Sequence, residues 1–262
     1  MYTGLQAAAP SKIKPAKKFT TKDDWPYDFK YRNVSASDVP PALDWRAKGS
    51  CYAFVATDTI ESLHAIQTKQ LVELSPKEIL DCCNCGGCKG GKMENAYRYV
   101  AENNGLTTEK NYPYKPAFET CAVKKENDIA VKIGGYQLVP LNNEEALMAA
   151  VVNQPIQVSI AVEPDFKMYK EGVLTSPCGT KVVHGVIAVG YDTAPDGTKY
   201  WIMKNSWGAD WGDNGYTKML RGVPEKEGYC GLCTGSHFPL TEPCSKEHAP
   251  GGDPVVKSSK DL

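Results

Sequence analysis

The sequence lacks the features that mark several large classes of protein. None of its apolar runs approaches the roughly 20 residues that span a bilayer, so we expect no membrane partner. The net charge of −1 at pH 7 gives no basic surface, so we expect no nucleic-acid partner. No internal repeat is present, and the first residues have no apolar core of a signal peptide. The chain is therefore expected to be a piece of a longer precursor or to be delivered by another route.

Cysteine is plentiful by comparison, with ten in 262 residues. So many thiols favour disulfides made in an oxidising compartment, and hence the secretory pathway. Two cysteine pairs could serve another purpose than a disulfide bond between distant segments. Cys85 and Cys88 have the CxxC spacing of half a zinc site. Cys230 and Cys233 have the CxxC spacing of a redox-active pair. No second CxxC with histidine lies near the first pair, and no thioredoxin-like βαβ pattern surrounds the second. We therefore expect disulfides, no metal and no cofactor.

Helical patterns fill the first half of the chain and strand patterns the second. Helices are expected over 51–70, from a capping box at Ser75 and Glu78 through Leu80, and over 92–105. One more helix over 144–154 interrupts a series of strand-like runs, which cover 130–139, 156–162, 184–192, 199–205 and 215–220. Helices first and strands later predict an α+β protein with two segregated lobes.

This order predicts four segments along the chain. They are an extended segment over 1–38, a mainly helical lobe over 39–130, a β-rich lobe over 131–240 and a disordered tail over 241–262. The first and last segments are polar or rich in proline, and neither has a sustained apolar period. We therefore expect the two middle segments to hold the hydrophobic cores.

Cys51 follows a Gly-Ser pair and opens the first helical run, so it is a candidate nucleophile. A cysteine nucleophile needs a base that holds it as thiolate and a partner that orients the base. Among the four histidines, His64 lies about 20 Å along the same helix and His248 lies in the tail. His184 begins an apolar strand-like run, and the end of a strand can present it to a cleft.

Asn205 supplies the third group, because it ends another strand-like run shortly before Trp207. An asparagine oxygen can fix the tautomer of an imidazole, and an indole can shield that hydrogen bond from water. Each residue also has a structural interpretation: Cys51 as a buried helix cysteine, His184 as a satisfied core histidine and Asn205 as a turn residue. Their occurrence together favours a catalytic site.

Over nearly its whole length the sequence resembles the papain-like cysteine proteases, of the plant papain and cathepsin L-like type. The resemblance is carried by DWRAKG, SCYAF, LSPKEILDC, GCKGG, NYPY, NQPIQVSI, CGTKVVHGVIAVGY, YWIMKNSWGADWGDNGY and GYCGL. The separations of Cys51 from His184 and from Asn205, roughly 130 and 150 residues, are those of this family. The resemblance implies a helical first lobe, a β-barrel-like second lobe and an active-site cleft between them.

The resemblance also implies a cysteine-type endopeptidase that hydrolyses peptide bonds through a thioester. Cys51 would be the nucleophile, with its pKa lowered by the helix N-terminus and by protonated His184. His184 would protonate the leaving amine and Asn205 would orient it, with Trp207 over their hydrogen bond. Implied partners are protein or peptide substrates and proteinaceous inhibitors of such proteases, and the chain is expected to be a monomer. A vacuolar, lysosomal or extracellular zymogen is implied, with 1–38 as the tail of its pro-segment.

Further roles follow from position in the motifs of the family. Gly90 and Gly91 would pair with the backbone of an extended substrate. The pocket for the second residue before the cut would be lined by Met93, Val182, Gly185 and Gly235, which suggests hydrophobic or aromatic side chains there. The resemblance implies the disulfides Cys82–Cys121 and Cys178–Cys230. The remaining candidate bridges are Cys83–Cys88, Cys85–Cys88 and Cys233–Cys244.

The sequence departs from the family just before the nucleophile. Family members carry a further stretch there, with a Gln that donates to the oxyanion and a cysteine that pairs within the first lobe. Here Gly49 joins Ser50 directly, so no residue takes the role of that Gln. Loss of one oxyanion donor typically lowers kcat by about 10²–10³-fold, so we expect an impaired enzyme. The alternatives are an inactive homologue with a peptide-binding, storage or defence role, and a truncated product that folds poorly.

Overall fold

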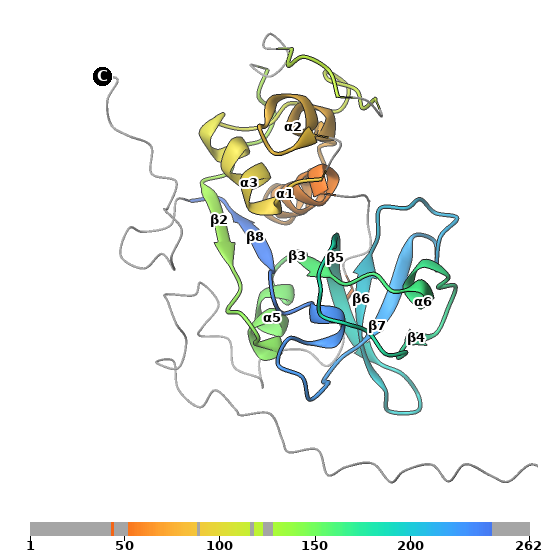
Figure 1. Cartoon of the computed structure of the whole chain (residues 1–262). Helices are drawn as coiled ribbons and strands as arrows, with labels where there is room; N and C mark the ends of the chain where they lie inside the picture. The colour runs from red at the N-terminus through yellow and green to blue at the C-terminus, as the bar shows by residue number, and fades with distance from the viewer. Residues whose placement is uncertain (1–42, 45–51, 88–89, 116–117, 123–127, 243–262) are drawn as a thin grey trace, which may run out of the picture.

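The computed structural model describes residues 43–44, 52–87, 90–115, 118–122 and 128–242 (Figure 1). Its helices are α1 (Tyr52–Thr68), α2 (Pro76–Cys82), α3 (Met93–Glu102), α5 (Glu144–Val151), α6 (Pro164–Lys167) and the 3₁₀ helix η3 (Tyr229–Gly231). The segment 1–38 and nearly all of the tail 241–262 lie outside the described residues. The expected boundaries between the four segments stay predictions.

The strands form one mixed sheet. They are β1 (Leu43–Asp44), β2 (Gly135–Leu138), β3 (Ile156–Ile160), β4 (Val173–Leu174), β5 (His184–Thr193), β6 (Lys199–Lys204), β7 (Tyr216–Leu220) and β8 (His237–Leu240). Their order is β2-β8-β3-β5-β6-β7-β4, with β1 paired to β5. The α+β class is confirmed, but among the described residues the sheet is open at β2 and β4. The expectation of a β-barrel-like second lobe is therefore wrong for the described residues, because their sheet does not close on itself.

The expected strand over 130–139 is shorter in the structure, because its first part serves the helical lobe. Val131 and Ile133 are buried in the same core as α1 and α3, and Val131 forms an isolated bridge with Leu106. Strand β2 begins only at Gly135 and then pairs with β8. The apolar residues before Gly135 thus have the sequence pattern of a strand, but in the structure their side chains fill the core of the helical lobe.

Helix α1 is buried on two sides, because its apolar residues point toward both lobes. Ala53, Ala56 and Ile60 belong to the core of the helical lobe. Val55 instead packs in a separate cluster with sheet residues Ile187, Val189 and Ile202. Figure 1 shows α1 below α2 and beside α3, at the end of the helical lobe that faces the sheet. The helix is therefore shared by the two lobes.

Strand β5 runs through the middle of the sheet and is covered on both faces. Alternate residues of a strand point to opposite faces. Val186 and Ala188 accordingly lie in the large core of the β lobe, whereas Ile187 and Val189 lie in the cluster with α1. This double burial explains why the run from 185 to 191 is apolar without alternation.

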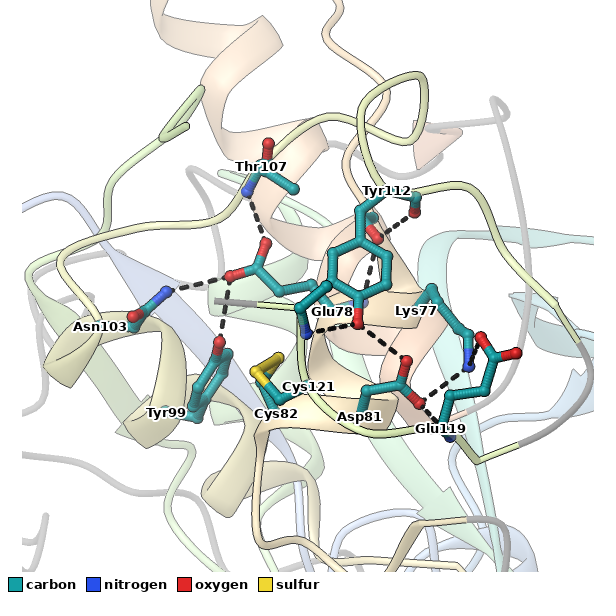
Figure 2. Close-up of a disulfide and its surroundings, with 12 residues drawn as sticks. Lys77, Glu78, Asp81, Cys82, Tyr99, Asn103, Thr107, Tyr112, Glu119 and Cys121 are labelled. Carbon is teal, nitrogen blue, oxygen red and sulfur yellow. Dashed lines mark hydrogen bonds and ion pairs between the residues drawn. A yellow bond between two sulfur atoms is a disulfide. The ribbon is translucent and has the colours of Figure 1, made fainter. Parts of the chain in front are cut away.

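Helix α2 begins with the expected cap, but its glutamate has another partner. The Ser75 Oγ accepts a hydrogen bond from the Glu78 backbone N–H at 3.0 Å. In a full capping box the glutamate would return to the cap. Here the buried Glu78 carboxylate accepts from the Tyr99 hydroxyl at 3.0 Å, Asn103 Nδ2 at 3.0 Å and the Thr107 N–H at 2.7 Å (Figure 2). It thus joins α2 to α3 and to the following loop.

A second polar cluster fixes the loop after α3 to the other side of α2 (Figure 2). Lys77 Nζ lies 2.8 Å from Asp81 Oδ1, and both side chains are fully buried. Asp81 also accepts from the Tyr112 hydroxyl at 2.9 Å. The disulfide Cys82–Cys121 lies beside this cluster and joins the same two segments. Hydrogen bonds and a covalent bond therefore hold a loop that has little regular structure.

Strand β8 begins with a partly buried histidine. The His237 Nδ1–H donates to Gln157 Oε1 at 3.0 Å, and the Gln157 amide donates to Ser159 Oγ at 3.2 Å. The imidazole also lies 5.9 Å from the Tyr136 ring. Burial lowers the pKa of His237 to about 4, while the charge of Glu94 opposes this shift. The folded protein therefore favours neutral His237.

The first prediction concerns Glu78. The Glu78→Ala variant removes the acceptor of the buried Thr107 N–H and of the half-buried Tyr99 hydroxyl and Asn103 amide, so we expect the free energy of unfolding to fall by about 3 kcal/mol. Urea unfolding followed by circular dichroism measures this change. The matched control is Glu102→Ala at the exposed end of α3, which should change stability by less than about 0.5 kcal/mol. A Glu78→Ala loss as small as that of the control would contradict the assigned role.

The second prediction concerns the acid side of the stability profile. The pKa of His237 is lower in the folded state than in the unfolded chain, so stability is fully present above pH about 6.5 and falls as pH drops toward about 4. The loss attributable to this group is roughly 3 kcal/mol at most. We expect His237→Gln to flatten the slope of unfolding free energy over this window.

Urea unfolding at several pH values between 7 and 4 checks this expectation. The His64→Gln variant is the matched control, because it changes a histidine of α1 outside the chain of hydrogen bonds through Gln157. Acid slopes that are equal in the wild type and in His237→Gln would refute the assignment.

Candidate active site

Two neighbouring strands bring His184 and Asn205 together. His184 is the first residue of β5, and Asn205 directly follows the last residue of β6. The two strands are antiparallel partners, with Ile187 opposite Lys204, so the start of one lies beside the end of the other. His184 Nε2 lies 2.8 Å from Asn205 Oδ1. Residues far apart in sequence therefore form one hydrogen-bonded pair.

The environment of Asn205 fixes which atom faces the histidine. The Asn205 N–H donates to the Gly215 carbonyl at 2.9 Å, and the Ser206 N–H donates to Asn205 Oδ1 at 2.7 Å. This amide oxygen is thus oriented as an acceptor, and Asn205 is only 4% exposed. Since an amide oxygen cannot donate, neutral His184 must carry its proton on Nε2. Its Nδ1 is then the nitrogen that can exchange a proton with a reacting group.

Aromatic side chains pack on one side of the His184 ring. The Trp207 ring lies 5.1 Å from the His184 ring at 31°, and Trp207 packs on Trp211 at 5.3 Å. Beneath them lies Phe166 of α6, which contacts Trp207 edge-on at 5.4 Å and Trp211 at 5.0 Å. Phe166 is fully buried. The cluster excludes water from one side of the pair, which strengthens its electrostatic interaction.

Phe166 is the residue of this cluster that sequence reasoning missed. Helix α6 has only four residues, too few for a periodic signal. The available sign was the Pro164 that starts it, since proline is favoured at the first helical position. The Trp211 indole N–H also donates to the Lys167 carbonyl at 3.1 Å, which ties the end of α6 to the tryptophans.

The expected nucleophile, Cys51, lies outside the described residues. Helix α1 is described from Tyr52, the residue that follows it. The first turn of α1 contains no acidic residue, so no carboxylate there offsets the partial positive charge of the helix N-terminus. The assignment of Cys51 as nucleophile stays a prediction.

Gly90 and Gly91 lie near the start of α1, and they differ in their surroundings. A Cβ on Gly91 would collide with the Cys85 carbonyl and would come within 2.8 Å of the Tyr52 ring. Gly90 has φ +90° and open space where a side chain would be. A side chain is thus excluded at Gly91 for lack of room, whereas at Gly90 the backbone itself is accessible. Pairing of these glycines with a substrate stays a prediction.

Three of the four expected pocket residues, Met93, Gly185 and Gly235, lie around the point where β5 pairs with β3. A Cβ on Gly185 would collide with the Met93 methyl group, so the two residues are in direct contact. Ser159 is the partner of Gly185 in the β3–β5 register, and its Oγ lies 3.8 Å from where Gly235 would carry a Cβ. Val182 instead packs beside Gly231. Ser159 was not singled out in the sequence, although its strand was.

The disulfides Cys82–Cys121 and Cys178–Cys230 are present in the structure, with the partners that the resemblance implied. Cys83 pairs with Cys85, in place of the bridges to Cys88 considered for either. Cys233 is a buried free thiol, and burial raises its pKa. Cys88 and Cys244 lie outside the described residues.

The described residues include neither a metal centre nor a membrane-spanning helix. They contain no group of three or more His, Cys, Asp or Glu side chains placed to hold a metal ion. No helix among them is long and apolar enough to cross a membrane.

Comparison with known proteins extends the resemblance. Residues 25–240 match the family described as "Papain family cysteine protease". Vignain of Phaseolus vulgaris is 45% identical over 227 residues, which make up 81% of this chain and 62% of that protein. The senescence-specific cysteine protease SAG12 of Arabidopsis thaliana is 40% identical over 253 residues, 91% of this chain and 71% of the relative. The chain thus spans about two thirds of the length of these relatives.

Solved structures give the same result for the fold. The bromelain protease of Ananas comosus, in complex with the E64 inhibitor, matches with a TM-score of 0.74 at 41% identity. The match covers 78% of this chain and 100% of the bromelain chain. The ragweed pollen cysteine protease Amb a 11, in its proform, has a TM-score of 0.77 at 41% identity and covers 82% of this chain and 70% of its own. The disulfides and these relatives indicate a secretory-pathway protein. On both its sequence and its fold, the chain belongs to the papain family of cysteine proteases, which are peptidases that act on protein substrates.

Proposed function

We propose that this chain is a cysteine endopeptidase in which Cys51, His184 and Asn205 act together. The observation that carries the proposal is the His184–Asn205 hydrogen bond of 2.8 Å under the Trp207 ring, in a chain of the papain family. Asn205 holds His184 in one tautomer, and the aromatic cluster keeps water from that bond. Such an oriented imidazole is what a thiol nucleophile requires.

The proposed reaction starts with proton transfer from Cys51 to His184 Nδ1. The N-terminus of α1 stabilises the thiolate, and the imidazolium does so as well. The thiolate attacks the carbonyl carbon of the peptide, the C–N bond breaks, and His184 gives its proton to the leaving amine. Water then attacks the thioester with His184 as base, which releases the acid and restores the thiol.

The rate of this reaction is expected to be low for the family. The chain has no residue in the position of the oxyanion Gln, so the backbone N–H of the nucleophile is the remaining expected donor. Removal of one donor typically costs about 10²–10³-fold in kcat. Slow turnover at an otherwise assembled site is therefore the specific form of the proposal.

Substrates are proposed to carry a hydrophobic or aromatic side chain at the second residue before the cut. Met93 contacts Gly185 beside the histidine, and Gly235 has no side chain to fill the space near Ser159. We further propose that the chain works as a monomer in the vacuole, the lysosome or outside the cell. Proteinaceous inhibitors of papain-like enzymes are proposed to bind the same site.

The third prediction tests the catalytic pair. E64 binds bromelain in the structure compared above, and an epoxysuccinyl reagent of this kind alkylates a reactive thiolate. We expect E64 to modify Cys51, as read by peptide mass spectrometry, and we expect His184→Ala to lower the labelling rate by about 10²-fold or more. Cys233 is an internal control, because its buried thiol stays protonated.

Absence of E64 labelling at Cys51 would contradict the proposed catalytic pair. A protein that unfolds cooperatively but leaves Cys51 unlabelled would have no assembled nucleophile. A peptide-binding, storage or defence role would then replace the proposal. A protein without a cooperative transition would be a poorly folded product.

The fourth prediction concerns specificity. In a fluorogenic peptide library, we expect the highest kcat/KM for Leu, Val, Phe or Tyr at the second position before the cut. The Gly185→Ala variant places a methyl group against Met93, so it should reduce kcat/KM for Phe and Tyr more than for Val. A preference of the wild-type protein for Arg at this position would contradict the apolar pocket.

A further inference from the structure

A buried ion pair connects the helical lobe to the sheet. Asp58 of α1 and Lys204 of β6 are 146 residues apart, and Lys204 Nζ lies 3.2 Å from Asp58 Oδ2. The two side chains are only 8% and 6% exposed. A charge buried to this degree needs its partner, because either one alone would be strongly destabilising.

Lys204 stands at a sensitive place in the sheet. It is the last residue of β6, and its backbone is paired with Ile187 on one side and Tyr216 on the other. The next residue is Asn205, which binds His184. Any shift of Lys204 therefore passes directly to the group that orients the imidazole.

Asp58 lies on the face of α1 that meets the sheet. It follows Val55 by three residues, and residues at this spacing share one face of a helix. Val55 packs on Ile187 and Ile202. Other polar residues of α1 serve the helical lobe, since Thr59 is 2.6 Å from the Tyr97 hydroxyl and Glu61 accepts from the Leu74 N–H at 2.7 Å. The polar contacts of α1 are thus divided between the lobes.

The two kinds of contact constrain α1 differently. Apolar contact is non-directional, so the cluster around Val55 tolerates small sliding or rotation of the helix. A buried ion pair has a defined geometry and is lost when the helix moves by more than a fraction of a turn. The ion pair is consequently a directional contact between α1 and β6, in contrast to the apolar cluster around Val55.

We propose that Asp58 and Lys204 are positioning residues, whose ion pair sets the distance between the start of α1 and the His184–Asn205 pair. The inference rests on the proposed function, in which the nucleophile directly precedes α1. It assigns the pair a geometric role beyond stability. Replacement of both members of a buried ion pair by apolar residues is often neutral for stability, so the two roles are separable.

The fifth prediction uses this separation. For Lys204→Met alone, we expect Tm to fall by about 10 °C and kcat to fall with it. For the double variant Asp58→Leu with Lys204→Met, we expect Tm to return to within a few degrees of the wild type. Its kcat and its E64 labelling rate should stay about tenfold or more below the wild type, with KM changed less than about twofold.

The matched control is Lys199→Met, the same substitution at the exposed first residue of β6, which should leave Tm and kcat unchanged. A double variant with the kcat and labelling rate of the wild type would overturn the inference. If the double variant does not fold, the Asp58→Glu variant tests the positioning role instead. It keeps the charge but changes the reach, so a lower kcat at unchanged Tm supports a geometric role and an unchanged kcat refutes it.

The reactivity of wild-type Cys51 with E64 distinguishes a failure of this inference from a failure of the proposed function. Wild-type protein whose Cys51 does not react with E64 would defeat the proposed function, and the positioning role with it. Reactive wild-type protein and an equally reactive double variant would defeat the positioning role alone.

Discussion

The packing of α1 against two hydrophobic cores is the constraint on which the rest of the structure depends. One side of the helix places Ala56 and Ile60 in the helical lobe, and another places Val55 against the sheet. A helix with a single apolar stripe would leave one of these cores incomplete. Because the core of the helical lobe and the cluster at the sheet both contain α1 residues, the helix links the two lobes, and its first residues are set near the sheet.

Strand β5 is the counterpart of α1 in the second lobe. It is covered on both faces, so its apolar residues fill both the core of the β lobe and the cluster with α1. Its first residue, His184, remains half-buried at the edge of this packing. The rigid strand thus ends in a polar side chain that is held but still accessible, which suits a general base. Asn205 and the ring of Trp207, from the segment that follows β6, complete its support.

The polar groups in the interior follow a consistent pattern, in which each acts as a joint between segments. Glu78 joins α2 to α3, the cluster of Lys77 and Asp81 holds the loop that ends at Cys121, and Asp58 reaches Lys204 across the lobes. Each is costly to bury and costly to break. Apolar packing therefore supplies most of the cohesion, while these groups fix which segments meet and in what geometry.

The sequence alone determined the class of fold and the identity of most candidate site residues. Local signals predicted the main elements: apolar spacing for α1, the capping box at Ser75 for α2, and helix and strand patterns for α3 and the main strands. The spacing of His184 and Asn205 from Cys51 pointed to one site, because motif order is written in the chain itself. Only the tertiary structure decided that the sheet is open, that Val131 and Ile133 serve the helical lobe, and that Glu78 turns away from its cap. It alone placed Phe166 beneath the tryptophans and Asp58 beside Lys204. These features depend on which distant residues meet when two cores close around α1, and no local pattern encodes that meeting.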